Sequence, residues 1–218
     1  LPLTQAGSYA GYMALAKSGL EEPASTHADH FNTNYAYSNA AYSKGATLLG
    51  ILGYVIGDSV RDAVLLNYYN TWKFKHPNAN DFFRVAEKTS GLQLQWLKEY
   101  WMNSTKTIDY GLNDIQAGNN TAIISIQRLG KLPMPIEVLI TYKDGTSELH
   151  YMPLDLMLGG KGSEGVVNQI VHPAWQWVAP TYTFETSKPL SALKSIEIDP
   201  SYRMPDLNRS NNKLEIPN

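Results

Sequence analysis

The stretch "TKTIDYGL", residues 105–112, marks the point at which the spacing of apolar residues changes. Before it, apolar residues recur about every 3.6 positions, as on one face of an α-helix. After it, apolar and polar residues alternate, as in a β-strand with one buried face. Because the two patterns do not mix, the sequence predicts an α+β protein with segregated domains. We expect an all-helical domain over residues 1–104 and a β-domain over residues 105–218.

Several amphipathic helices are predicted on the N-terminal side of this boundary. The first lies around Tyr9 and Tyr12 and ends at Gly19, since glycine commonly ends helices. A second begins at Ser38, a residue type that favours helix N-caps, and ends before the turn at Gly57. Further helices are expected over residues 59–74, 81–88 and 92–103.

Short strands are predicted on the C-terminal side, where the alternating segments are rich in Val, Ile, Thr and aromatic residues. These segments are residues 121–129, 136–154, 175–187 and 194–200. Lys143-Asp144-Gly145 is a hairpin turn between two of the strands. Several short strands without intervening helices predict an antiparallel β-sandwich.

The composition of the 218 residues excludes some classes of function. The formal net charge is −2 and no run of Lys and Arg stands out, so we expect no nucleic-acid partner. The absence of cysteine excludes disulfides, thiolate metal sites and a cysteine nucleophile. No window approaches the roughly 18 apolar residues of a membrane span, so we expect none.

A second segment, "YSNAAYSKGA" at residues 37–46, opens an apolar helix with two tyrosines and a lysine. On periodicity alone, Tyr42 would be a half-buried core residue. The pattern Tyr-x-Lys-Gly in this place, however, resembles the segment that follows the zinc ligands in the aminopeptidase-N-like gluzincin metallopeptidases. Tyr42, Lys44 and Gly45 supply the pattern here.

The resemblance continues along residues 48–101 through an ordered series of features. A helix closes at Ile-Gly-Asp, a Tyr-Tyr helix follows, and then come an Asp-Phe helix entry, a Glu-x-x-Ser-Gly turn and a helix with Trp. The β-half, with Trp175-Gln-Trp177 and residues 196–212, resembles the domain that follows the catalytic helices in some bacterial members. The resemblance implies the C-terminal end of a catalytic domain and a following β-sandwich.

Zinc in that family is held by two histidines of His-Glu-x-x-His and by a later Glu, while the motif's own Glu activates water. All of these are absent from this chain, whose five histidines include no pair four residues apart. We therefore expect a C-terminal fragment that binds no zinc and is inactive alone. The complete enzyme would contain zinc, cleave peptide bonds near the N-terminus of peptides, and include an upstream catalytic domain as this chain's partner.

The resemblance also implies roles for individual side chains. Tyr42 would donate a hydrogen bond to the oxyanion of the tetrahedral intermediate. Tyr37 would line the same wall and bind substrate, with plain packing as the alternative. For Lys44, contact with substrate is the alternative to a surface lysine with a buried stem, which we favour.

The segment "STHADHF", residues 25–31, places His27, Asp29 and His30 within four positions. It could be a metal cluster, an acid–base site or a hydrogen-bonded loop, and without a third convincing ligand the loop is favoured. If the resemblance holds, the loop borders the substrate cleft and His30 binds substrate.

A rival interpretation is a non-catalytic binding or scaffold protein derived from the same family. Nothing within these residues excludes it, and the presence of the zinc motif upstream would distinguish the two. The low share of charged residues, 17%, and the resemblance favour a periplasmic or extracellular location in a bacterium.

Overall fold

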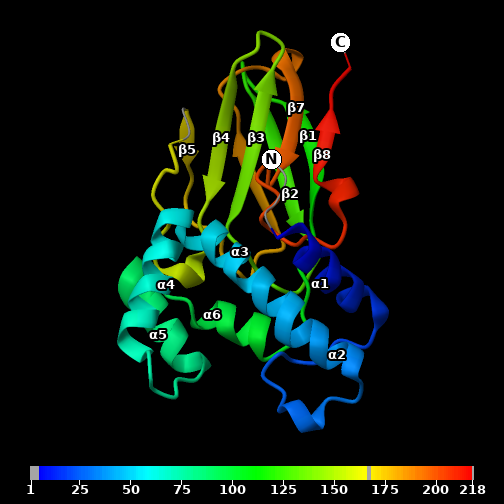
Figure 1. The fold of residues 1–218 in the computed structure, drawn as a ribbon. Helices are drawn as coiled ribbons and strands as arrows, with labels where there is room; N and C mark the ends of the chain where they lie inside the picture. Colours follow the sequence, from blue (N-terminus) through cyan, green and yellow to red (C-terminus); the bar gives the residue numbers. More distant parts are fainter. Residues whose placement is uncertain (1–4, 166–167, 218) are drawn as a thin grey trace. The chain divides into compact units, whose positions relative to one another are not determined.

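The computed structural model describes residues 5–165 and 168–217. The chain forms two compact units (Figure 1). The first, here called the helical unit, contains Leu1–Lys106, Leu156–Glu164 and Arg203–Pro205. The second, the strand unit, contains Thr107–Asp155, Gly165–Tyr202 and Asp206–Asn218. Helices and two sheets confirm the α+β class, while the division into domains 1–104 and 105–218 stays a prediction.

The helical unit consists of α-helices joined by short π-helical and 3₁₀ turns. The α-helices are α1 (Ala6–Ser18), α2 (Asn34–Ser38), α3 (Gly45–Ile56), α4 (Asp58–Trp72), α5 (Ala79–Ser90) and α6 (Gln95–Leu97). The π-helical turns are η2 (Asn39–Lys44) and η3 (Lys98–Met102), and η1 (Ala28–His30) is 3₁₀. All five helices expected from the periodicity are therefore present.

Two helices begin earlier than the sequence predicts. The helix expected at Ser38 begins at Asn34, because the Thr33 side chain caps it by accepting the Ala36 N–H at 3.0 Å. The helix expected at Asp81 begins at Ala79, because Asn78 and Asp81 form a reciprocal capping box. In both cases an earlier residue satisfies the free N–H groups of the first turn.

The core of the helical unit is built around α3. Most residues of its second half are buried, which fits the nearly continuous apolar sequence there. Side chains of the neighbouring helices complete this core, and fully buried examples are Tyr12, Leu15, Ile51, Leu52, Val64, Phe83, Leu94 and Trp101.

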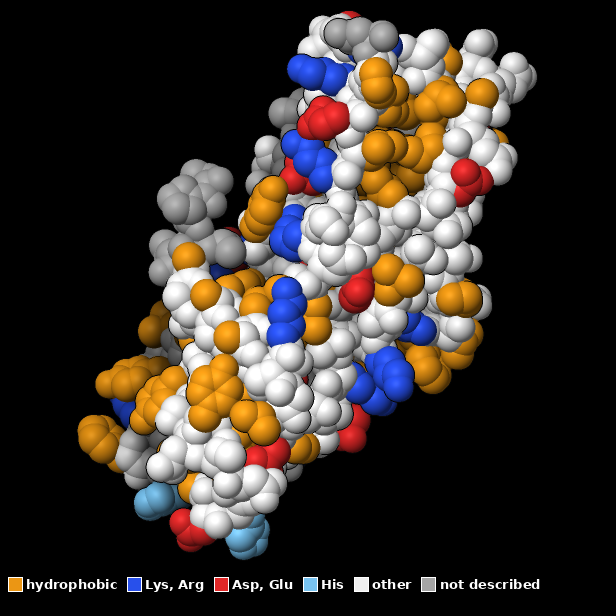
Figure 2. All heavy atoms as spheres, turned by 90° about the vertical axis from the view of Figure 1, so that its right-hand side faces the viewer, with side chains coloured by type: hydrophobic (Ala, Val, Ile, Leu, Met, Phe, Trp, Pro, Cys, Tyr) orange, Lys and Arg blue, Asp and Glu red, His pale blue; other side chains and the backbone are white. Residues whose placement is uncertain are grey.

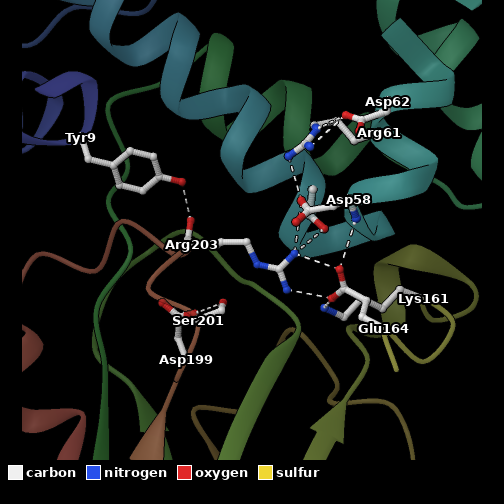
Figure 3. Close-up of polar contacts among 10 residues, drawn as sticks. Tyr9, Asp58, Arg61, Asp62, Lys161, Glu164, Asp199, Ser201 and Arg203 are labelled. Carbon is white, nitrogen blue, oxygen red and sulfur yellow. Dashed lines mark hydrogen bonds and ion pairs between the residues drawn. The ribbon is translucent and has the colours of Figure 1, made fainter. Parts of the chain in front are cut away.

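Two later chain segments belong to the helical unit, and Arg203 attaches one of them (Figure 3). Its guanidinium donates to both carboxylate oxygens of Glu164, at 3.0 and 2.7 Å, and to the Gly53 carbonyl at 3.2 Å. The Tyr9 hydroxyl donates to the Arg203 carbonyl at 2.7 Å. Side-chain and backbone groups of Arg203 thus both bind the helices.

Glu164 is the centre of this ion cluster. It also accepts hydrogen bonds from Lys161 at 2.5 Å and from the Asp58 N–H at 3.2 Å. Burial alone would raise the pKa of Glu164, but the hydrogen bonds and positive charges of Arg203 and Lys161 outweigh it and lower the pKa to about 2. The carboxylate is therefore ionised at neutral pH.

The strand unit contains a three-stranded sheet and a five-stranded sheet. The order in the first is β1-β2-β6 and in the second β5-β4-β3-β7-β8. The bounds are β1 (Tyr110–Ala117), β2 (Ala122–Arg128), β3 (Ile136–Tyr142), β4 (Ser147–Met152), β5 (Gln169–Val171), β6 (Thr181–Glu185), β7 (Leu193–Ile198) and β8 (Lys213–Glu215). The expectation of purely antiparallel strands is wrong for the second sheet, because β5 pairs with β4 in parallel.

The predicted hairpin joins β3 and β4, with Thr141 opposite Ser147. Gly145 adopts φ of 85°, a conformation that glycine tolerates and that the turn requires. Strands β5 and β8 were not expected, since three residues are too few to show alternation. Each of them forms by hydrogen bonding to a longer strand, β5 to β4 and β8 to β7.

Apolar side chains of both sheets fill the core of the strand unit. Buried members include Ile124, Ile126, Val138, Ile140, Ile196 and Phe184. The ring of His150 on β4 lies 4.5 Å from the ring of Phe184 on β6, so side chains of the two sheets are in contact. Among the described residues of the whole chain, no helix has the length and apolarity to cross a membrane.

Candidate functional site

Tyr42 lies in the π-helical turn η2, between α2 and α3. Its side chain is 74% exposed, and its hydroxyl has no hydrogen-bond partner among the residues that the structure describes. π-helical turns are rare and are often found at functional sites. A large phenol held in solvent at the entrance of a buried helix is not a core residue, so periodicity alone gives the wrong interpretation of Tyr42.

Lys44, two residues later, is fully buried. The expectation of a surface lysine is therefore wrong. Its Nζ donates to Glu21 at 2.6 Å and to the Ser104 carbonyl at 3.0 Å. Burial lowers the pKa of Lys44, and the nearby Glu21 carboxylate opposes that shift. Glu21, which lies 23 residues earlier in the sequence, thus partly compensates the buried ammonium of Lys44 for its lost contact with water.

Tyr37 lies in α2 and is 37% exposed. Its ring packs edge-on against Phe31, with ring centroids 5.6 Å apart. Phe31 directly follows His30, so packing brings Tyr37 next to the loop that carries that histidine. Among the described residues, no hydrogen bond or ring contact joins Tyr42 to Tyr37 or His30.

His27, Asp29 and His30 are exposed around the short helix η1, on the surface of the helical unit where Figure 2 shows histidine beside acidic side chains. His27 Nδ1 accepts the Asp29 N–H at 3.3 Å and therefore caps η1, as a hydrogen-bonded loop would. In the described part of the chain, no three His, Asp or Glu side chains are grouped to hold a metal ion.

A second cluster lies in the strand unit and centres on the Glu148 carboxylate of β4. Its oxygens accept hydrogen bonds from the hydroxyls of Tyr142 and Ser187, from the Ser187 N–H at 3.1 Å, and from His150 Nε2 at 2.9 Å. Ser187 binds the carboxylate and not an imidazole, so the arrangement differs from a Ser-His-acid catalytic triad. The four donors instead stabilise a buried negative charge.

The chain of hydrogen bonds continues from His150 to His172. His150 Nδ1 lies 2.7 Å from His172 Nε2, and the two rings are stacked. Because ionised Glu148 can only accept, His150 carries its proton on Nε2 and accepts at Nδ1. His172 then donates from Nε2 and has an unprotonated Nδ1. This is the arrangement for two neutral histidines, the form that the lowered pKa of each favours at neutral pH.

Sequence reasoning did not find this cluster, although a signal exists. Glu148 and His150 are two residues apart in a strand, so their side chains share one face. Both faces of β4 are buried from Glu148 to Met152, with Glu148 5% and His150 0% exposed. Two polar residues on one face of a strand whose other buried residues are apolar indicate a buried polar network.

The histidine pair predicts a pH dependence for the strand unit. Burial lowers the pKa of His150, against the raising effect of Glu148, and burial together with His150 lowers the pKa of His172. The unfolded chain therefore binds more protons than the folded one at mildly acidic pH, so stability falls as the pH decreases below about 6.5. Urea unfolding between pH 8 and pH 5, followed by hydrogen exchange of β4, measures the effect.

The control for this prediction is His76, an exposed histidine of the helical unit. His172→Phe keeps an aromatic ring beside Phe184 but removes one titrating group, so it should flatten the pH dependence. His76→Gln should leave it unchanged. A strand unit equally stable at pH 5 and pH 8 contradicts the prediction.

The comparisons with known proteins give a fold relationship. No family model and no curated protein matches the sequence. The crystal structure of Legionella pneumophila aminopeptidase A in complex with aspartic acid is similar, with a TM-score of 0.54 and 13% sequence identity over 78% of this chain. That share exceeds the helical unit, so part of the strand unit is included. The fold of this chain is therefore similar to that of part of the aminopeptidase chain.

This chain spans 18% of the length of that aminopeptidase chain. At 13% identity the similarity concerns the fold alone.

Proposed function

We propose that this chain is the C-terminal part of a zinc-dependent metallopeptidase that resembles the gluzincin aminopeptidases. It would comprise the helical end of the catalytic domain followed by a domain in which the two sheets pack as a β-sandwich. The complete protein would hydrolyse peptide bonds near the N-terminus of peptides. The observation that carries the proposal is Tyr42, whose unpaired hydroxyl is exposed on a π-helical turn at the start of a buried helix.

Tyr42 is proposed as the donor to the oxyanion of the tetrahedral intermediate. A phenol suits this role because it is neutral at pH 7, has few torsions and donates one hydrogen bond. The hydroxyl has no partner among the described residues, so it needs no other bond to break before it meets substrate. Tyr42 lies on a turn whose last residue, Lys44, is fully buried and hydrogen-bonded.

Tyr37 and His30 are proposed to bind substrate. They lie on adjoining segments, since the Tyr37 ring packs against Phe31. Both are exposed enough to meet a peptide. The other proposed partner is the upstream catalytic domain, which would supply the zinc ligands that this chain does not offer. A periplasmic or extracellular location in a bacterium belongs to the same proposal.

The test compares this chain with the full-length protein from the same gene. This chain alone is expected to retain no stoichiometric zinc after dialysis and to release no amino acid from peptides, since it lacks the paired histidines and the water-activating Glu. The full-length protein is expected to do both. Metal analysis and a peptide-hydrolysis assay on the two proteins give the answer.

Two results would contradict the proposal. A full-length protein without His-Glu-x-x-His, without zinc and without activity would favour the non-catalytic scaffold. One tightly bound zinc per copy of this chain would instead require a metal site at His27, Asp29 and His30.

A further inference from the structure

The buried ammonium of Lys44 makes polar and cation–π contacts that hydrophobic packing of its side chain alone would not require. The ammonium is bound by the Glu21 carboxylate and the Ser104 carbonyl, and it lies 5.3 Å from the centroid of the Trp101 ring. The Glu21 side chain is itself only 5% exposed. An ion pair this deeply buried contributes little net stability compared with apolar residues of the same size. Stability alone therefore does not account for the presence of Lys44 and Glu21.

The pair connects the turn that carries Tyr42 to two separate segments of the helical unit. Glu21 comes from the loop after α1, whereas Ser104 follows η3. The backbone is held as well, because Trp101 Nε1 donates to the Lys44 carbonyl at 3.2 Å. Side-chain and backbone contacts of Lys44 thus fix the last residue of the turn.

The opposite side of the turn rests on α1. An added Cβ at Gly11 would lie 2.5 Å from Ser43 Oγ, so α1 approaches the turn as closely as a glycine permits. Ser43 Oγ also hydrogen-bonds Asn39 Oδ1 at 3.1 Å across the turn. Within this support, Tyr42 is the large side chain that the turn exposes.

We propose that Lys44 and Glu21 are positioning residues for Tyr42. Their buried ion pair holds the π-helical turn in the one geometry that presents the Tyr42 hydroxyl. The inference rests on the proposed role of Tyr42 and extends it to two residues that do not touch substrate. A turn free to return to regular helix would rotate and shift Tyr42, and a displacement of about 1 Å in a reacting group can cost up to about 10²-fold in rate.

The test separates positioning from stability with one single and one double variant. Lys44→Met leaves the Glu21 carboxylate buried without its partner and is expected to lower stability and speed hydrogen exchange in residues 39–44. Glu21→Met/Lys44→Met removes both charges, so stability should return to about that of the wild type. Exchange in residues 39–44 should stay fast, because the turn is still unfixed. Lys17→Met, an exposed lysine of α1, is the control and should change nothing.

The same variants in the full-length peptidase give the functional result. Both Lys44→Met and the double variant are expected to lower kcat about 10- to 100-fold with a smaller change in KM. A double variant that regains kcat and slow exchange together with stability would show that the pair only stabilises the fold. Tyr42→Phe is measured in parallel. If it keeps full activity, the proposed role of Tyr42 fails and the positioning role falls with it, whereas an active Lys44→Met beside an inactive Tyr42→Phe overturns positioning alone.

Discussion

Replacing Tyr42 with Phe is expected to lower kcat of the proposed full-length peptidase about 10²- to 10³-fold, the usual cost of removing one oxyanion donor. The ring stays, so packing and folding should hardly change. KM should change less than kcat, because the lost hydrogen bond is made chiefly in the transition state. Steady-state kinetics beside a zinc measurement test the prediction.

Two tyrosines of the helical unit serve as controls. Tyr37→Phe should have a much smaller effect, since its proposed contact is with bound substrate. Tyr69→Phe changes another largely exposed phenol, 62% exposed on α4, and should have no effect. A Tyr42→Phe enzyme with near-normal kcat would return Tyr42 to a structural role.

Replacing Glu148 with Ala should destabilise the strand unit by about 3–5 kcal/mol, the range found when one partner of a buried charged network is removed. The loss leaves the hydroxyls of Tyr142 and Ser187 and the Nε2–H of His150 buried without their acceptor. Urea unfolding of the chain, with hydrogen exchange of β3 and β4 as the local readout, measures the change.

Glu185→Ala is the matched control for this prediction. Glu185 lies on β6, is exposed and accepts one hydrogen bond from the Thr121 hydroxyl at 3.0 Å. Its removal should cost less than about 1 kcal/mol. If Glu148→Ala proves as mild as Glu185→Ala, water replaces the lost acceptor and the network is not the stabilising feature described above.

The parts of the fold that the sequence predicts are those that depend on neighbouring residues. The helices and the hairpin at Gly145 follow from local periodicity and from the conformations that glycine allows. Local rules failed where caps competed. Ser38 was the expected N-cap, but the Thr33 side chain caps the helix and starts it at Asn34.

The parts that the sequence does not predict depend on residues far apart in the chain. The burial of Lys44 requires Glu21 and Ser104, which no spacing rule associates with it. The π-helical turn is likewise invisible, because the close approach of Gly11 to Ser43 is a tertiary contact. Tyr42 itself was selected by resemblance to a family, since its periodicity indicated a core position.

The position of Arg203 late in the sequence affects the order in which the helical unit folds during synthesis. Arg203 binds the Gly53 carbonyl across 150 residues of sequence, so the last contacts of the helical unit wait for residues synthesised long after α3. At about 5–20 residues per second, the ribosome needs on the order of 10 seconds for that interval. Before Arg203 is made, the cationic partner of Glu164 is Lys161 and that of Asp58 is Arg61. The helices therefore emerge first but complete their folding late, and a chain cut before residue 203 would lose the guanidinium that joins three segments.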